Sequence, residues 1–170
     1  MIIVKKGCNL WEEVYNENND SPDAYDAVVC NTSKTVRGNG MLVMSTKQEK
    51  EFNDRFPGLS ETWGHRFQNQ LNTYGVMVNP TFIKRKNNPA ELEGNVDLLF
   101  IAAFPTRKEY KNTPDMKTIE TSAVTLKKLA DTMGWDKILM SAPEGISWEE
   151  EVKPVFDKLF DTRFTVIINE

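Results

Sequence analysis

The sequence is poor in the side chains that bind transition metals. Its 170 residues include two cysteines, Cys8 and Cys30, and one histidine, His65. A zinc cluster with four cysteine or histidine ligands needs more of these side chains than the chain has. A lone histidine also speaks against a Ser-His-Asp triad, and we expect His65 on the surface. We therefore expect no metal site and no cofactor.

Long apolar runs are also missing. No stretch approaches the ~20 consecutive apolar residues that span a bilayer, so we expect no integral membrane segment. The opening residues, MIIVKK, form too short an apolar run for a secretory signal and precede no small-residue cleavage site. We expect a soluble cytoplasmic protein in which both cysteines stay reduced.

The chain has no excess of basic residues. Its 25 acidic and 21 basic side chains give a net charge of −4 and an isoelectric point near 5.2. Sequence-independent binding to a phosphate backbone requires the opposite balance, so nucleic acid is not expected as the main partner. Hydrophobic residues make up 39% and charged residues 27%, as in ordinary globular proteins. A chain of this length is expected to form one domain, residues 1–170.

Apolar runs and turn residues divide the chain into alternating strands and helices. Ala27, Val28 and Val29 form a run that is apolar on both faces, which predicts a central strand. The run VDLLFIAAF (96–104) predicts a second interior strand. Other strands are expected at 2–4, 74–83, 137–142 and 164–168, with a turn or short helix at 10–15 and a helix at 63–71. This order predicts a three-layer α/β/α sandwich around a mixed sheet, with polar excursions at 16–23 and 84–95.

Three helices carry end signals. The first holds Phe52 and Phe56, four residues apart, as packing residues and stops at Pro57-Gly58. For the second, Thr113 and Pro114 predict the N-cap and the first helical residue, and Gly134 predicts the end. Its expected buried stripe is Ile119, Ala123, Leu126, Ala130 and Met133. The third opens with a capping box at Ser147–Glu150, is kinked by Pro154, and has an expected buried face of Trp148, Val152, Val155 and Leu159.

Four segments, which leave out mainly residues 60–95, match one known arrangement of strands, loops and helices. They are IIVKKGCNLW, VVCNTSKTVRGNGMLVM with FNDRFPGL, LLFIAAFPTRKEY with IETSAVTLKKLADTMGW, and DKILMSAPEGISWEEEVKPVFDKLFDTRFTVII. In these segments the chain resembles the macrodomain family of ADP-ribose-binding α/β/α proteins, and looks most similar to small phage and bacterial macro-like proteins. The resemblance implies that a cleft at the carboxyl ends of the strands binds ADP-ribose or a related adenine nucleotide.

The two ligand loops depart from the glycine-rich patterns of the family. Counted back from Phe56 without a gap, the family's Met-Gly-x-Gly falls on Met44–Lys47, so both glycines are absent. The alternative register places them on Gly38 and Gly40 and requires an insertion, so we prefer the gapless one. The second loop, 142–147, keeps one glycine, Gly145.

The resemblance implies ligand-binding residues in both loops and after the first two strands. The family's adenine-binding aspartate falls on Cys8 or, better, on Asn9, which is also an ordinary turn residue. In the first loop, Thr46 and its neighbours offer donors and a helix N-terminus to a phosphate, or Thr46 simply caps the helix with Glu49. The expected ligand-binding residues are Asn9, Asn31, Ser45, Thr46, Lys47, Glu144, Gly145 and Ile146.

Two residues are candidates for catalysis. Glu144 is the carboxylate of the second loop and can activate water if its surroundings raise its pKa; the alternative is a merely exposed side chain. Lys108 resembles a lysine of one deglycosylating branch of the family, and the alternative is that RKEYK (107–111) is a solvated charge run. Three functions stay open: binding of an ADP-ribose-like nucleotide, hydrolysis of ADP-ribosyl or ADP-ribose-1''-phosphate substrates, and a degenerate macrodomain that serves as a protein-interaction module.

Overall fold

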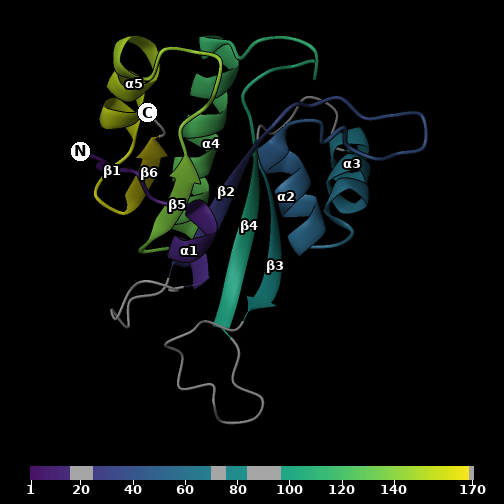
Figure 1. Ribbon diagram of the computed structural model, residues 1–170, viewed down its shortest axis with the longest axis horizontal. Helices are drawn as coiled ribbons and strands as arrows, with labels where there is room; N and C mark the ends of the chain where they lie inside the picture. Colours follow the sequence, from purple (N-terminus) through teal and green to yellow (C-terminus); the bar gives the residue numbers. More distant parts are fainter. Residues whose placement is uncertain (16–24, 70–75, 84–96, 169–170) are drawn as a thin grey trace.

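The computed structural model describes residues 1–15, 25–69, 76–83 and 97–168. Its centre is a six-stranded sheet in the order β1-β6-β5-β2-β4-β3 (Figure 1). The strands are β1 (Ile3–Lys6), β2 (Ala27–Thr32), β3 (Met77–Ile83), β4 (Asp97–Pro105), β5 (Ile138–Ser141) and β6 (Phe164–Ile168). Neighbouring strands run parallel except β3 and β4, which are antiparallel. The predicted mixed sheet is confirmed.

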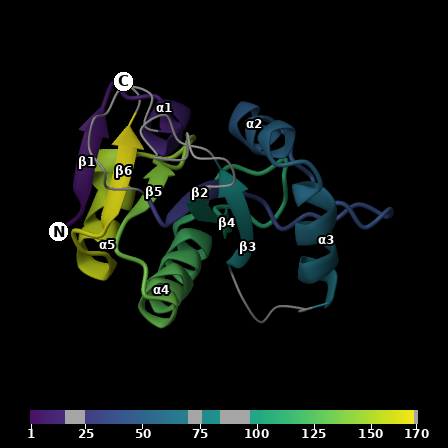
Figure 2. The same cartoon turned by 90° about the horizontal axis from the view of Figure 1, so that it is seen from below.

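Helices cover both faces of the sheet (Figure 2). On one face lie α4 (Met116–Met133) and α5 (Lys153–Leu159), and a π-helical turn, η1 (Trp148–Val152), leads into α5. On the other face lie α1 (Leu10–Tyr15) and α2 (Lys47–Arg55), with α3 (Leu59–Asn69) near the β3 edge. This arrangement is the predicted α/β/α sandwich.

Strand β2 contributes to the hydrophobic core on both faces of the sheet. Ala27 and Val29 belong to the cluster under α4 and α5, whereas Val28 and Cys30 belong to the cluster under α1, α2 and α3. Side chains alternate between the two faces of a strand, so a strand buried on both faces must be interior. β2 lies between β5 and β4, which confirms the predicted central position.

The carboxyl ends of the parallel strands meet at one edge of the sheet. The segments that follow β1, β2, β4 and β5, residues 7–9, 33–46, 106–115 and 142–147, lie at this edge. Backbone hydrogen bonds tie two of them together, since Lys34 N donates to Lys108 O over 3.1 Å and Thr106 N donates to Thr32 O over 2.9 Å. Open α/β sheets commonly bind ligands at this edge.

Helix α4 begins two residues later than predicted. Its N-cap is Asp115 rather than Thr113, and the Asp115 carboxylate accepts hydrogen bonds of 2.8 Å from both the backbone N and the hydroxyl of Thr118. Pro114 therefore precedes the cap instead of opening the helix. A carboxylate satisfies a free N–H group and also opposes the positive end of the helix dipole, which favours this cap over a threonine.

The apolar stripe of α4 is buried except at its last residue. Ile119, Ala123, Leu126 and Ala130 are all inaccessible to solvent, as predicted, but Met133 is 43% exposed. Gly134 ends the helix in the left-handed conformation, with φ of 70°. Trp135, which follows this cap and is buried, fills the core there instead of Met133.

The third helix is capped as predicted, and Pro154 lies where the helix changes type. Ser147 Oγ accepts a hydrogen bond of 3.3 Å from Glu150 N, which confirms the capping interaction. η1 is π-helical, and α5 starts at Lys153 with Pro154 in its first turn. Pro154 has no N–H to continue the helical hydrogen bonds of η1, so the proline and the change of helix type coincide. The fully buried side chains on this helix are Val152 and Phe156, and Trp148, Val155 and Leu159 pack partly buried against the same cluster.

Other predicted elements differ only in their ends. The helix predicted at 63–71 starts earlier, at Leu59, and the strand predicted at 74–83 starts at Met77. The polar segments predicted at 16–23 and 84–95 lie outside the described residues. Among the helices that the structure describes, none is long and apolar enough to cross a membrane.

Candidate functional site

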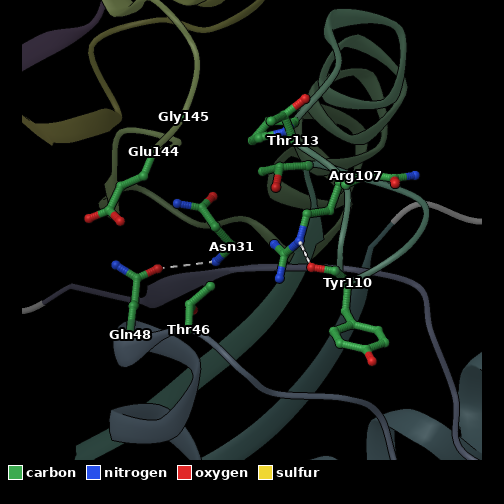
Figure 3. A pocket seen from close by; sticks show the side chains of 11 residues that line it. Asn31, Thr46, Gln48, Arg107, Tyr110, Thr113, Glu144 and Gly145 are labelled. Carbon is green, nitrogen blue, oxygen red and sulfur yellow. Dashed lines mark hydrogen bonds between the residues drawn. The ribbon is translucent and has the colours of Figure 1, made fainter.

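Two adjoining cavities lie at the carboxyl edge of the parallel strands. The first, of about 350 Å³, lies between the segments that follow β2, β4 and β5 (Figure 3). The second, of about 210 Å³, lies between the segments after β1 and β5 and the start of α2. Gln48 and Glu144 line both cavities, so the two adjoin each other, and together they are here called the strand-end cleft. Its size falls in the range of small-molecule sites.

Six of the eight predicted ligand-binding residues line the strand-end cleft. The first cavity is lined by Asn31, Thr46, Glu144 and Gly145, and the second by Asn9, Lys47 and again Glu144. Ser45 and Ile146 line neither cavity. Ser45 is exposed, and Ile146 packs partly buried against the hydrophobic cluster under α4 and α5.

Asn31, the penultimate residue of β2, connects three elements. Its Nδ2 donates to Ser141 O on β5 over 3.0 Å, and its backbone N donates to Gln48 Oε1 on α2 over 3.3 Å (Figure 3). Its Oδ1 is buried and has no hydrogen-bond partner in the described part of the chain. A buried acceptor without a partner costs about 1–3 kcal/mol. A donor on a bound ligand or a water molecule would satisfy it.

Thr46 is the N-cap of α2. Its Oγ1 accepts a hydrogen bond of 3.2 Å from Glu49 N and donates one of 2.9 Å to Glu49 Oε1. The backbone N–H groups of Lys47 and Gln48, the next two positions, have no partner among residues 1–15, 25–69, 76–83 and 97–168. The capping interpretation of Thr46 is correct. The two free N–H groups at the positive end of the helix dipole would still stabilise a bound anion.

Gly38 and Gly40 lie outside the strand-end cleft, in the turn of a short hairpin formed by residues 36–42. Gly40 N donates to Arg37 O over 2.8 Å, which closes the turn. The hairpin lies against α3, where a Cβ atom on Gly64 would come within 2.1 Å of Gly40 O. These glycines serve a turn and a helix contact, as the gapless register expects.

Asn9 caps α1 with its side chain. Its Oδ1 accepts hydrogen bonds of 2.9 Å from Trp11 N and 3.3 Å from Glu12 N. It is thus the turn residue that the alternative interpretation predicted. Because Oδ1 is engaged in the cap, Nδ2 is the group that Asn9 offers to the second cavity.

Gly145 brings the segment after β5 against the start of α4. It adopts a φ of 81°, and an added Cβ atom would lie 3.2 Å from Pro114 Cδ. Both conditions favour glycine at this position. The neighbouring Glu144 is exposed, as its alternative interpretation expected, and is the only carboxylate among the residues that line the first cavity.

The segment 107–111 is not a solvated charge run throughout. The Arg107 side chain is 7% exposed, and its Nη2 donates to Oε1 of the fully buried Glu49 over 2.7 Å. Arg107 Nε also donates to Tyr110 O over 3.3 Å (Figure 3). Lys108 and Glu109 are exposed, so the solvated interpretation holds for them. Lys108 lines neither cavity of the cleft.

Sequence reasoning favoured a solvated charge run for Arg107, and it did not identify Gln48 as a residue of the cleft. A signal for the ion pair was present, because Glu49 precedes the core residue Phe52 by three positions and so shares its helix face. A carboxylate on a buried helix face requires a cationic partner. Gln48 carried no such signal, since its contact depends on how closely α2 approaches β2.

The described residues contain no cluster of three or more metal-ligating side chains. Cys8 and Cys30 are free thiols. Burial raises the pKa of the Cys30 thiol well above its ordinary value, so Cys30 stays protonated and acts as a core residue.

No family model and no curated protein matches the sequence. Solved structures match it closely in shape. The macrodomain of Thermus aquaticus DarG is 18% identical with a TM-score of 0.66 and covers 100% of this chain and 98% of its own. The macrodomain of Mycobacterium tuberculosis DarG is 18% identical with a TM-score of 0.66, over 98% and 97% of the two chains. A structure titled Thermosipho africanus DarTG in complex with ADP-ribose is 16% identical with a TM-score of 0.62, over 85% of this chain and 38% of that one. The chain has the macrodomain fold, as its four sequence segments predicted.

Proposed function

We propose that the strand-end cleft binds ADP-ribose or a related adenine nucleotide. The observation that carries the proposal is the two-part cleft, with adjoining cavities of about 350 and 210 Å³ that share Gln48 and Glu144 as lining residues on a macrodomain fold. A ligand with an adenosine at one end and a second ribose at the other fits two adjoining spaces of this kind. A structural neighbour with the same fold was solved in complex with ADP-ribose, which supports the choice of ligand.

The second cavity suits the adenosine end of this ligand. Its lining combines the apolar side chains of Leu10, Trp11 and Ile167 with polar groups. Trp11 is held in place by a hydrogen bond of 2.8 Å from its Nε1 to Glu51 Oε2. An adenine ring packs on apolar and aromatic side chains, and Asn9 Nδ2 supplies a donor for a ring nitrogen. We place the adenine there.

The start of α2 lies between the two cavities and suits the phosphates. Lys47 lines one cavity and Thr46 the other. The free N–H groups of Lys47 and Gln48 and the ammonium of Lys47 all favour an anion, whereas Glu144 opposes it. We therefore expect a net electrostatic attraction that is modest and weakens with added salt.

The cleft offers only one of the two candidate catalytic residues for hydrolysis. Glu144 is the candidate general base that lines the first cavity, and Lys108 lines neither cavity. General acid–base help contributes about 10²- to 10⁴-fold to a rate. We propose binding as the function, with release of ADP-ribose from modified substrates absent or very slow. Rapid multiple turnover that Glu144→Gln abolishes would overturn this part of the proposal.

Isothermal titration with ADP-ribose, ADP, AMP and adenosine tests the binding proposal. We expect a submillimolar dissociation constant for ADP-ribose and weaker binding of adenosine, which lacks the phosphates. Chemical shifts of Asn31, Gln48 and Gly145 should change on titration, because these residues line the cleft. No detectable binding of any of these nucleotides would refute the proposal and favour the protein-interaction module.

A further inference from the structure

The Arg107–Glu49 ion pair borders the first cavity of the strand-end cleft. Arg107 lines the cavity, whereas Glu49 lies behind it with its side chain fully buried. The two are joined by a hydrogen bond of 2.7 Å between Nη2 and Oε1. A second bond of 3.3 Å, from Nε to Tyr110 O, fixes the plane of the guanidinium. The cation is therefore held rigidly before any ligand arrives.

The guanidinium keeps unused donors on the cavity side. Of its five N–H groups, Nε and one on Nη2 are engaged with protein acceptors. Nη1 has no acceptor among the residues that the structure describes, and it retains some exposure to solvent. Arg107 lines the first cavity, so this exposed donor is available to a ligand there. In Figure 3 the guanidinium points toward Asn31 and Thr46.

A buried ion pair adds little to the stability of the fold. Its desolvation offsets much of the attraction, and apolar side chains of similar volume often serve as well. A rigid guanidinium with free donors in a ligand-sized cavity is, however, well suited to the oxygens of a phosphate. Two charged side chains line this cavity, Arg107 and the exposed Glu144. Because Glu144 is negative, Arg107 supplies the positive charge of the cavity.

We infer that Arg107 binds a phosphate group of the nucleotide through Nη1, with Glu49 and Tyr110 O as its positioning partners. This inference rests on the proposed function and adds a specificity: ligands without a phosphate lose the contact. Glu49 also withdraws part of the positive charge from the cavity. Removing the Glu49 charge while keeping its shape should therefore strengthen phosphate binding, whereas a purely structural pair predicts no gain.

Two variants separate binding from packing. Glu49→Gln keeps Arg107 and removes the neighbouring negative charge. The double variant Glu49→Gln with Arg107→Met removes both charges and keeps similar volumes, so that no buried charge is left unpaired. Arg37→Met is the matched control, because Arg37 is exposed on the hairpin outside the cleft. A thermal melt without ligand verifies that each variant is folded.

Isothermal titration with ADP-ribose, ADP, adenosine and inorganic pyrophosphate provides the readout. We expect the double variant to bind ADP-ribose and ADP about tenfold to a hundredfold more weakly than the wild type, with adenosine within twofold. Glu49→Gln should bind ADP several-fold more tightly and with a steeper dependence on salt. Arg37→Met should match the wild type for every ligand.

Each contrary result is informative. An equal loss of ADP and adenosine in the double variant, or weaker ADP binding by Glu49→Gln, would overturn the inference and make the pair structural. Normal ADP-ribose binding by the double variant would overturn it while leaving the proposed function intact. If the wild type binds pyrophosphate but not ADP-ribose, and the double variant loses the pyrophosphate binding, the proposed nucleotide is refuted and the phosphate site is supported.

Discussion

Replacing Gly64 by alanine tests how α3 packs against the hairpin of residues 36–42. The added Cβ atom would lie 2.1 Å from Gly40 O and 2.6 Å from Leu42 N, both backbone atoms that cannot rotate away. Overpacking of this kind costs about 1–3 kcal/mol. Strain on the 2.8 Å hydrogen bond from Leu42 N to Ser60 O costs about 1 kcal/mol more. Alanine regains about 1 kcal/mol of helix propensity, so the net loss is about 2 kcal/mol.

A loss of this size lowers the melting temperature of a chain of this length by about 4–8 °C. Thermal unfolding followed by circular dichroism measures it. Gly38→Ala is the control, since it lies in the same hairpin and no atom lies within 4 Å of its added Cβ atom. That variant should melt within about 2 °C of the wild type. Equal melting temperatures for the two variants would refute the contact between α3 and the hairpin.

Three further predictions concern charge and capping. Lys47→Glu should weaken ADP-ribose binding several-fold in a titration, whereas Lys128→Glu, on the exposed side of α4, should not; equal effects would place the ligand elsewhere. Ser147→Ala should lower the free energy of unfolding in urea by about 1 kcal/mol, and no change would mean that the cap is unimportant. Hydrogen bonds from Arg163 hold the pKa of Asp161 below its ordinary value. The ionised Asp161 carboxylate therefore stabilises the fold at pH values above its unfolded pKa of about 3.9. This stabilisation is lost as the pH falls through the folded pKa. Asp161→Asn should therefore flatten the loss of stability as the pH falls below the unfolded pKa of about 3.9, and an unaltered pH profile would contradict the pairing.

The helix ends show where sequence signals were sufficient and where tertiary contacts decided. Ser147 and Gly134 act as predicted, because their caps involve only neighbouring residues. At the start of α4 the sequence predicts Thr113 as the cap because a proline follows it, whereas the structure has Asp115 there. Asp115 N, however, donates to Thr106 O over 3.0 Å, which holds Asp115 extended beside the end of β4. That long-range bond leaves Asp115 as the residue where the helix can begin.

The cleft was predictable in position more than in composition. A central apolar strand followed by a loop and a helix points to the carboxyl edge of the sheet, where the two cavities lie. Arg107 was harder to interpret because it stands beside Lys108 and Glu109 in a polar run. Only its burial against Glu49, 58 positions away in sequence, distinguishes it from its exposed neighbours.

The positions of the glycines explain how the cleft can exist with fewer of them than the family pattern contains. Gly38 and Gly40 belong to the hairpin turn, and Gly64 is required where α3 meets that hairpin, so none of the three faces the cleft. Gly145 does line the cleft. Its positive φ and the nearby Pro114 disfavour a side chain at this position. At the start of α2, by contrast, the groups that would face a ligand in the proposed complex are backbone N–H groups at the end of a helix, which any residue with helical dihedrals supplies. Lys47 stands where the family pattern has a glycine, and its side chain lines the second cavity. In the proposed complex, a cation near the phosphate oxygens would offset the narrower approach.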